Sequence, residues 1–198
     1  MLALMPIRTD FEFIFRHQPD NSAHRRDYEG VMKSAESLLR DERIRFAFLH
    51  MPVPHPPGIY DRTKHQISSH GDYLDNLVLA DDTLGTLIKI LRSTQSGQQT
   101  TVIVSSDHSW RTPFWKPGSD WSDGEERASN GGKFDRRPVL MVHLPKADTG
   151  ELISKPLSAL AVHSILDGLL RGEIHTQTDL ENLIDHLPQE TVAAQVRN

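Results

Sequence analysis

Thr100-Thr-Val-Ile-Val-Ser-Ser-Asp-His108 is the stretch of sequence that decides the fold class. Residues 100–105 are mostly β-branched and apolar, the composition of a buried strand in a parallel sheet. Upstream, apolar residues repeat with helical spacing from Leu74 to Leu91, and Arg45-Phe-Ala-Phe-Leu-His50 predicts a strand before that helix. Strand, helix and strand form a βαβ unit, in which the strands are parallel and the crossover is right-handed. The sequence therefore predicts an α/β fold.

The elements on either side of this unit follow from the same kind of pattern. Strands are expected over 11–15 and 139–143, and helices after Asp27, over 162–170 and from a capping box at Thr178-Asp-Leu-Glu181. Residues 109–137 are polar and show no convincing period. Structureless loops of that length tend to be functional lids or disordered segments, so we interpret this region as one of the two.

Composition narrows the function classes. The chain has 198 residues, with 22 Lys and Arg against 27 Asp and Glu, and a formal net charge of −5. This charge and a pI near 6.1 give no general attraction to nucleic acid. Cysteine is absent, which excludes a disulfide framework, a cysteine nucleophile and cysteine-ligated zinc. No apolar run approaches the roughly 18–20 residues of a membrane span. The 11 histidines are then the main candidates for chemistry.

Asp107 and His108 form the sharpest candidate site. Ligands of open α/β sheets bind at the carboxyl ends of the strands, and this pair directly follows the strand predicted over 100–105. A carboxylate beside an imidazole suits Zn²⁺ or Mn²⁺, and the carboxylate alone suits Ca²⁺ or Mg²⁺. We interpret the two residues as metal ligands. The alternative is a turn aspartate that caps the next segment beside a surface histidine.

His55 lies in a loop that four prolines among residues 52–57 make stiff. Such a loop can hold an imidazole where it donates a hydrogen bond to an oxyanion or a leaving group, so His55 is the candidate catalytic residue. The alternative is an exposed loop histidine. His50 ends the strand 45–50, and a parallel pairing would bring it to the same sheet edge as Asp107. It fits a core histidine about as well as a substrate-binding residue.

Lys133 follows two glycines, which would let its cation approach an anionic ligand closely, although a solvated basic turn explains it equally well. His65 and His70 lie near Asp61 and Asp72 and would add to a metal shell, but they fit solvated loop residues better. Five further histidines have no converging neighbours and are interpreted as structural or solvent-facing: His17, His24, His163, His175 and His186.

Four groups of residues occur in an order that is specific in combination. They are Phe46-Ala-Phe-Leu-His-Met-Pro-Val-Pro-His-Pro-Pro57, Tyr73-Leu-Asp-Asn-Leu77 with Asp81-Asp-Thr-Leu-Gly85, Thr101-Val-Ile-Val-Ser-Ser-Asp-His108, and Lys133 with Arg136-Arg-Pro138. Together they resemble the alkaline phosphatase superfamily, and most closely its sulfatase-like branch of arylsulfatases and lipid-headgroup phosphotransferases. The similarity runs from about residue 45 to residue 170.

This resemblance implies a three-layer α/β/α fold around a mostly parallel sheet. It also implies hydrolysis or transfer of a phosphate or sulfate ester by a metal-activated Ser, Thr or formylglycine nucleophile. By position, Asp107 and His108 would bind the divalent metal (Zn, Mn, Ca or Mg). His55 would contact the transferred group or protonate the leaving oxygen, and Lys133 would clamp the anion, with His50 as a further substrate-binding candidate. The implied partner is an anionic ester.

The departures from the superfamily pattern concern the nucleophile. Members carry it, with further acidic ligands, on an early strand, whereas this chain has only about 45 residues before the proline-rich loop and no Ser-x-Pro-x-Arg motif. We therefore expect residues 1–188 to be the C-terminal portion of a sulfatase-like catalytic domain, incomplete without an N-terminal half, and 189–198 to be a frayed tail. The alternative is a non-catalytic anion- or metal-binding module of the same fold. Relatives often work outside the cytoplasm or at membranes, so the compartment of a longer parent protein stays open.

Overall fold

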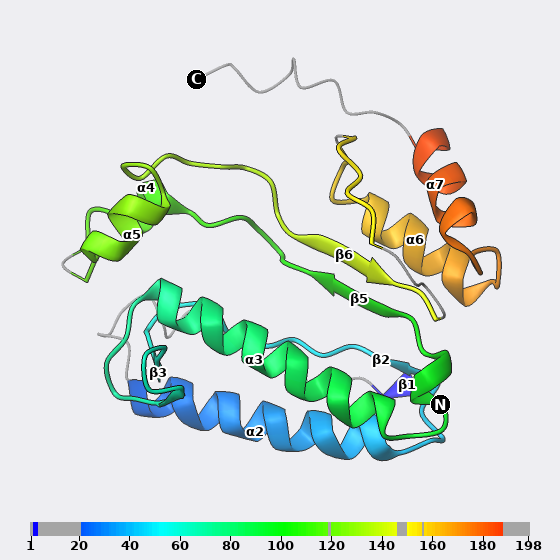
Figure 1. Cartoon of the computed structure of the whole chain (residues 1–198), viewed down its shortest axis with the longest axis horizontal. Helices are drawn as coiled ribbons and strands as arrows, with labels where there is room; N and C mark the ends of the chain where they lie inside the picture. The colour runs from blue at the N-terminus through cyan, green and yellow to red at the C-terminus, as the bar shows by residue number, and fades with distance from the viewer. Residues whose placement is uncertain (1, 4–20, 119, 146–149, 156, 188–198) are drawn as a thin grey trace. The chain divides into compact units, whose positions relative to one another are not determined.

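The computed structural model describes residues 2–3, 21–118, 120–145, 150–155 and 157–187 (Figure 1). The chain divides into two compact units, each with its own hydrophobic core. Unit 1 comprises residues 1–98 and 108–137, and unit 2 comprises residues 99–107 and 138–198. The strand expected over 11–15 and the tail expected over 189–198 lie outside the described residues.

Unit 1 is built on two long helices that lie side by side, α2 (Asn21–Arg40) and α3 (Tyr73–Arg92) (Figure 1). Short elements complete it: β1 (Leu2–Ala3), β2 (Phe46–Ala47), β3 (Tyr60–Asp61), β4 (Gln66–Ile67), α4 (Thr112–Trp115) and α5 (Asp123–Ala128). A 3₁₀ turn, η1 (Gly97–Gln99), follows α3. β1 and β2 pair in parallel, and β3 and β4 form an antiparallel hairpin.

The core of unit 1 joins both helices to the proline-rich loop. Tyr28 of α2 and Leu79 of α3 pack with Val53, Ile59 and Tyr60, and all five are buried. Each helix presents its apolar residues to this core at helical spacing, which explains why the amphipathic patterns form helices here. The loop that carries His55 is therefore held between the two helices and not on a free surface.

Unit 2 contains β5 (Val102–Ser105), β6 (Leu140–His143), α6 (Ala161–Leu170) and α7 (Gln177–His186). β5 and β6 are antiparallel, with Ile103 opposite Val142. One face of this pair packs on the helices: Ile103, Leu140 and Val142 contact a buried cluster of Leu144, Ile165, Ile174, Leu180 and Ile184. Alternation along the strands thus separates a core face from an exposed face that includes Met141.

The fold is mixed α/β, but the expected three-layer, mostly parallel sheet is not seen among the described residues. Their strands form three two-stranded sheets, of which β1–β2 alone is parallel. The buried-strand composition of 100–105 predicted a strand correctly but not its partner, because β5 pairs with the antiparallel β6. β2 extends over two residues only, and proline at positions 52 and 54 follows it closely. Within the described part of the chain, none of the helices combines the length and the apolar character that membrane crossing requires.

Candidate functional site

The proline-rich loop is fixed to α3 by one buried amide. Asn76 is fully buried, and its Nδ2 donates to the carbonyls of His55 and Pro57, each at 3.0 Å. Its Oδ1 accepts the backbone N–H of Ile59 at 2.9 Å. The amide thus uses both donors and its acceptor on one loop of five residues, which orients the backbone on either side of His55.

The His55 ring is oriented by two contacts. Its Nδ1 lies 2.5 Å from the carbonyl oxygen of Pro56, and a carbonyl can only accept, so Nδ1 carries the proton. In the neutral ring Nε2 then carries the lone pair. Trp115 in α4 packs against this ring in a T-shaped arrangement, with a centroid distance of 5.5 Å and an interplanar angle of 89°. His55 is half-buried, whereas His50, at the start of the same segment, is exposed.

Asp107 and His108 follow β5, as the sequence predicted, and the division between the two units falls between them. His108 is half-buried and its Nδ1 lies 2.8 Å from the carbonyl oxygen of Ser109. The same tautomer argument assigns the lone pair to Nε2, which is the usual state of a metal-binding histidine whose other nitrogen donates to a backbone carbonyl. Asp107 is exposed.

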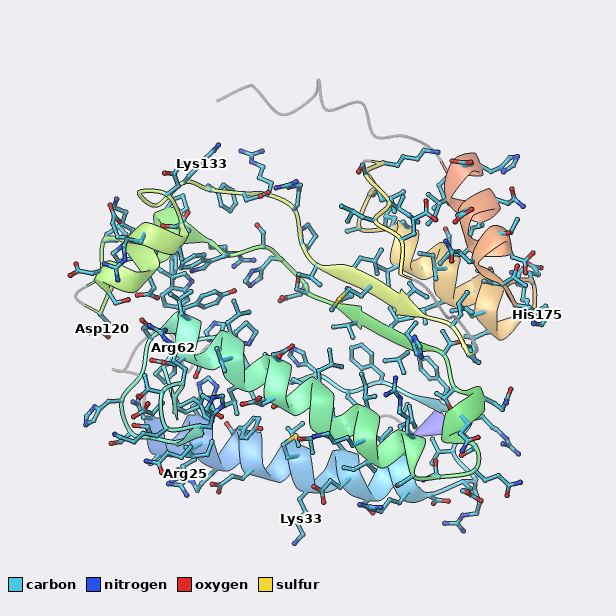
Figure 2. All side chains as sticks on the ribbon, in the orientation of Figure 1. Arg25, Lys33, Arg62, Asp120, Lys133 and His175 are labelled. Carbon is cyan, nitrogen blue, oxygen red and sulfur yellow. The ribbon has the colours of Figure 1, made fainter. Side chains whose placement is uncertain are left out.

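Lys133 lies on the turn after α5 and is exposed (Figure 2). The two glycines before it have positive φ angles of 81° and 80°, a region that side chains rarely adopt. A Cβ on Gly132 would come within 2.5 Å of the Lys116 side chain. Gly132 thus allows a close approach by Lys116, whose ammonium binds Glu126 and the carbonyl of Gly131, both at 2.8 Å.

The segment 109–137 is not structureless, because it contains α4 and α5 and an aromatic stack. Trp110 stacks on Tyr73 of α3 with ring centroids 4.6 Å apart and on Trp121 at 5.4 Å. Trp121 also donates from Nε1 to a carboxylate oxygen of Glu126 at 2.8 Å. Large aromatic contacts therefore replace the regular apolar period that the sequence lacks there.

Helix capping fastens the same segment to α3. Asp72 caps α3 and Ser122 caps α5, and the Ser122 hydroxyl donates to Asp72 at 2.7 Å. The buried Glu125 carboxylate accepts from the backbone N–H groups of Ser122 and Tyr73. Arg62 donates to Asp72 at 2.8 Å, next to the start of α3 (Figure 2). Burial favours a higher pKa for Asp72, but the Ser122 hydroxyl, a backbone N–H and Arg62 outweigh it and lower that pKa.

His24 in α2 is the residue that sequence reasoning missed. It was interpreted as a bystander because the helical pattern was traced only after Asp27, but α2 begins at Asn21 and directs His24 towards Pro52. Burial is the main cause that lowers its pKa, and the charge of His55 is the second. Spacing from Asn21 and Tyr28, three residues before and four after, would have been the signal.

The donor set fits a divalent metal only in part. Asp107 and His108 offer a hard carboxylate and an imidazole, but zinc takes about four ligands and calcium more. Within the ranges that the structure describes, no group of three or more His, Asp or Glu side chains is arranged to hold a metal ion. The described residues therefore supply at most a fraction of a coordination shell.

The chain belongs to the sulfatase family, because residues 12–132, more than half of its length, match that family. It is thus a member of the alkaline phosphatase superfamily. The matched region includes His50, His55, Asp107 and His108 and ends directly before Lys133. Searches of curated proteins and of solved structures gave no match. Members of the family are typically metal-dependent ester hydrolases that act on anionic esters.

Proposed function

We propose that this protein acts on a sulfate or phosphate ester at a site centred on His55. The observation that carries the proposal is the fixation of that imidazole within the region that matches the sulfatase family. Asn76 fixes the backbone of the loop, Pro56 fixes the ring tautomer and Trp115 packs against the ring. A group held in this way loses little entropy when it meets a ligand, which is what positioning of a reacting group requires.

His55 is the proposed general acid. In its protonated form Nδ1–H stays on the Pro56 carbonyl, and Nε2–H donates to the oxygen that links the alcohol to the sulfuryl or phosphoryl group. As a nucleophile supplied by another residue bonds to the sulfur or phosphorus, that S–O or P–O bond breaks. The proton moves from Nε2 to the leaving oxygen, and the alcohol departs neutral. His50 and Lys133, both exposed, are proposed to bind the anionic oxygens.

Asp107 and His108 are the proposed ligands of a divalent metal, Zn, Mn, Ca or Mg. The Nε2 lone pair of His108 and the carboxylate of Asp107 are donors of the kind that such ions bind. When bound, the metal would offset the negative charge of the ester oxygens. In this proposal the nucleophile and the remaining metal ligands are residues other than the five named here. The three-layer sheet of the superfamily is also part of the proposal. The choice between an arylsulfatase and a headgroup phosphotransferase also belongs to it.

Turnover of p-nitrophenyl sulfate and p-nitrophenyl phosphate with each of the four metals tests the activity. His55→Gln is expected to lower any turnover at least tenfold, because general acid catalysis typically contributes a factor of about 10²–10⁴. His70→Gln, an exposed histidine on the loop before α3, is the matched control and should leave turnover unchanged. Ester binding without turnover would favour a non-catalytic module, and turnover that survives His55→Gln would overturn the role of His55.

Isothermal titration with Zn²⁺, Mn²⁺ and Ca²⁺ tests the metal ligands. Asp107→Ala should weaken binding, whereas Asp81→Ala, an exposed aspartate on α3, should not. Binding by the wild type is expected to be weak, since two ligands rarely form a tight site. Identical titration curves for the wild type and Asp107→Ala would refute the assignment.

A further inference from the structure

One body within unit 1, which we call the flap, consists of residues 110–118 and 120–132. It contains α4 and α5, which are joined by the ammonium of Lys116, because this group donates to Glu126 at 2.8 Å. Trp121 also donates to Glu126 at 2.8 Å, and its ring stacks on Trp110 at the start of the flap. These contacts tie the parts of the flap to one another, so the flap can move as one body.

Polar and aromatic contacts attach the flap to the start of α3 (Figure 1). The hydroxyl of Ser122 donates to Asp72 at 2.7 Å, and the backbone N–H of Tyr73 donates to Glu125 at 3.2 Å. The ring of Tyr73 stacks on Trp110 with the ring centroids 4.6 Å apart. By contrast, the described residues that form the buried core of unit 1 all come from outside the flap. The flap can therefore leave α3 without breaking that core.

The last residues of the flap have a backbone that rotates easily. Asn130, Gly131 and Gly132 follow α5 with positive φ angles of 51°, 81° and 80°. Glycine adopts both signs of φ at similar cost, so two adjacent glycines permit a large change in chain direction. Residues 133–137 come next, and all of them are exposed and belong to none of the helices or strands. Hinges of moving segments commonly lie at such loop positions, so this end of the flap fits a hinge.

The flap reaches His55 through Trp115. The Trp115 ring packs against the half-buried imidazole in a T-shaped arrangement, with the ring centroids 5.5 Å apart. His55 lies between Val53 and Ile59, which belong to the buried core, whereas Trp115 belongs to the flap. Movement of the flap away from α3 therefore separates the two rings and uncovers the imidazole.

Two polar atoms of the flap oppose its position against α3. Trp110 Nε1 and Thr112 Oγ1 are buried and have no hydrogen-bond partner in the part of the chain that the structure describes. Water satisfies an indole N–H or a hydroxyl when the group is exposed, so burial of these atoms costs free energy that movement of the flap recovers. The attachments to α3 thus hold the flap in place, and these two atoms favour its release.

We propose that the flap is a lid on His55, which opens by rotation at Gly131 and Gly132 and closes on the start of α3. In the closed form Trp115 packs on the imidazole and orients it, and in the open form the ring is accessible to a ligand. The lid adds a step to the reaction, and this step rests on the proposed function. The ester enters while the lid is open, and closure returns Trp115 to the ring and excludes water.

Hydrogen exchange of the ligand-free protein, followed by mass spectrometry, tests whether the flap opens as one body. Backbone N–H groups of α4 and α5 should exchange together and at least about tenfold faster than those around Leu79 in α3, because the flap opens while the core stays folded. Exchange of α4 and α5 at the same rate as α3 would overturn the lid, since the flap would then open only when unit 1 unfolds.

Four variants test what holds the lid closed. Ser122→Ala on the flap and Tyr73→Ala on α3 each remove one attachment, so each should speed exchange of the flap about threefold or more. Thr112→Val removes a buried hydroxyl and keeps its shape, so it should slow that exchange. Ser34→Ala, which removes a serine hydrogen bond within α2, is the control and should leave the flap unchanged. Unchanged exchange of the flap in both Ser122→Ala and Tyr73→Ala would overturn the lid.

Labelling with diethyl pyrocarbonate, which acylates an unprotonated imidazole nitrogen, tests whether the flap covers His55. The rate at His55 is measured relative to the rate at His175, an exposed histidine of unit 2. Tyr73→Ala and Ser122→Ala should raise this ratio by the factor by which they speed exchange of the flap, and Thr112→Val should lower it. A ratio that stays constant while exchange of the flap changes would overturn the lid and leave the proposed function standing. Neither experiment uses an ester, so a failure of ester turnover would count against the proposed function and not against the lid.

Discussion

Replacement of Asn76 by alanine is expected to loosen the loop that carries His55. The native amide makes three hydrogen bonds, to the carbonyls of His55 and Pro57 and to the N–H of Ile59, and its side chain is fully buried. Alanine removes all three and leaves the loop groups without these partners. The perturbation therefore acts on the backbone of the candidate site without touching the imidazole of His55.

The magnitude follows from the unsatisfied groups. Each buried donor or acceptor left without a partner costs about 1–3 kcal/mol, and neighbouring losses do not add fully. We expect Asn76→Ala to lower the free energy of unfolding of unit 1 by about 3–5 kcal/mol. That is a large share of the roughly 5–15 kcal/mol that stabilises a typical domain.

Urea unfolding followed by tryptophan fluorescence measures this change. The protein has three tryptophans, at positions 110, 115 and 121, and all of them belong to unit 1. Thr86→Ala, an exposed substitution on the same helix, is the control and should stay within about 0.5 kcal/mol of the wild type. If Asn76→Ala cost less than about 1 kcal/mol, the reasoning that this amide holds the loop would be refuted.

Three other outcomes follow from the structure. Because the pKa of Asp72 is lowered in the folded protein, its contribution to stability is full above about pH 5 and is lost as the pH falls through the folded pKa. Asp72→Asn keeps an N-cap but does not titrate. It should therefore flatten the fall in the urea midpoint between about pH 5 and pH 2. Burial raises the pKa of all three tyrosines, Tyr28, Tyr60 and Tyr73. The pKa of Tyr60 rises to about 12, with its hydrogen bond to the Asp82 carboxylate as the second cause after burial. Ultraviolet titration of the folded protein should therefore show little phenolate at pH 10, and stability should fall as the pH rises above 10; normal ionisation near 10 would contradict this burial. Ile165 is 1% exposed in unit 2, so Ile165→Ala should lower the free energy of unfolding by about 2–5 kcal/mol, measured by unfolding followed by circular dichroism. A loss below about 1 kcal/mol would contradict the packing described there.

Periodicity predicted the helices well, although only some of the apolar residues in each pattern pack in the cores: Val78 and Ile165 do so, whereas Leu77 and Leu170 are exposed. The helix from 74 to 91 is α3, and the helix over 162–170 is α6. The last helix was expected from a capping box formed by Thr178 and Glu181. The capping box in the structure is formed by Thr176 and Asp179, so the helix begins two residues earlier. Aspartate at the third position makes the same reciprocal bonds as glutamate, so the motif was recognised in the wrong register.

Local sequence patterns could not predict how the strands pair or how the segment 109–137 folds. The composition of 100–105 favours a buried strand but does not name its neighbour, and the partner is 35 or more residues away in sequence at 140–143. The segment 109–137 is ordered by Trp110, by Trp121 and by bonds between helix caps, none of which has a period. These are long-range contacts, and they form only when the chain has folded.

The candidate site was predictable where chemistry and local stiffness coincide. The proline-rich loop around His55 and the Asp107-His108 pair were identified from the sequence, and their roles stay predictions. His24 was not identified, because its surroundings depend on a helix face that meets a loop about 30 residues further along the chain. The role of Asn76 in holding the loop could not be predicted from the sequence either, because its three hydrogen-bond partners are backbone groups.

Binding of an anionic ester at His55 is the central claim, and one NMR titration tests it most directly. Methyl sulfate and methyl phosphate are added to the wild type while all histidine ring signals are observed. We predict that the His55 signal moves, because the bound anion lies against this ring. His163 and His175, exposed in unit 2, should not respond. An unmoved His55 signal, or an equal response from every exposed histidine, would contradict the account.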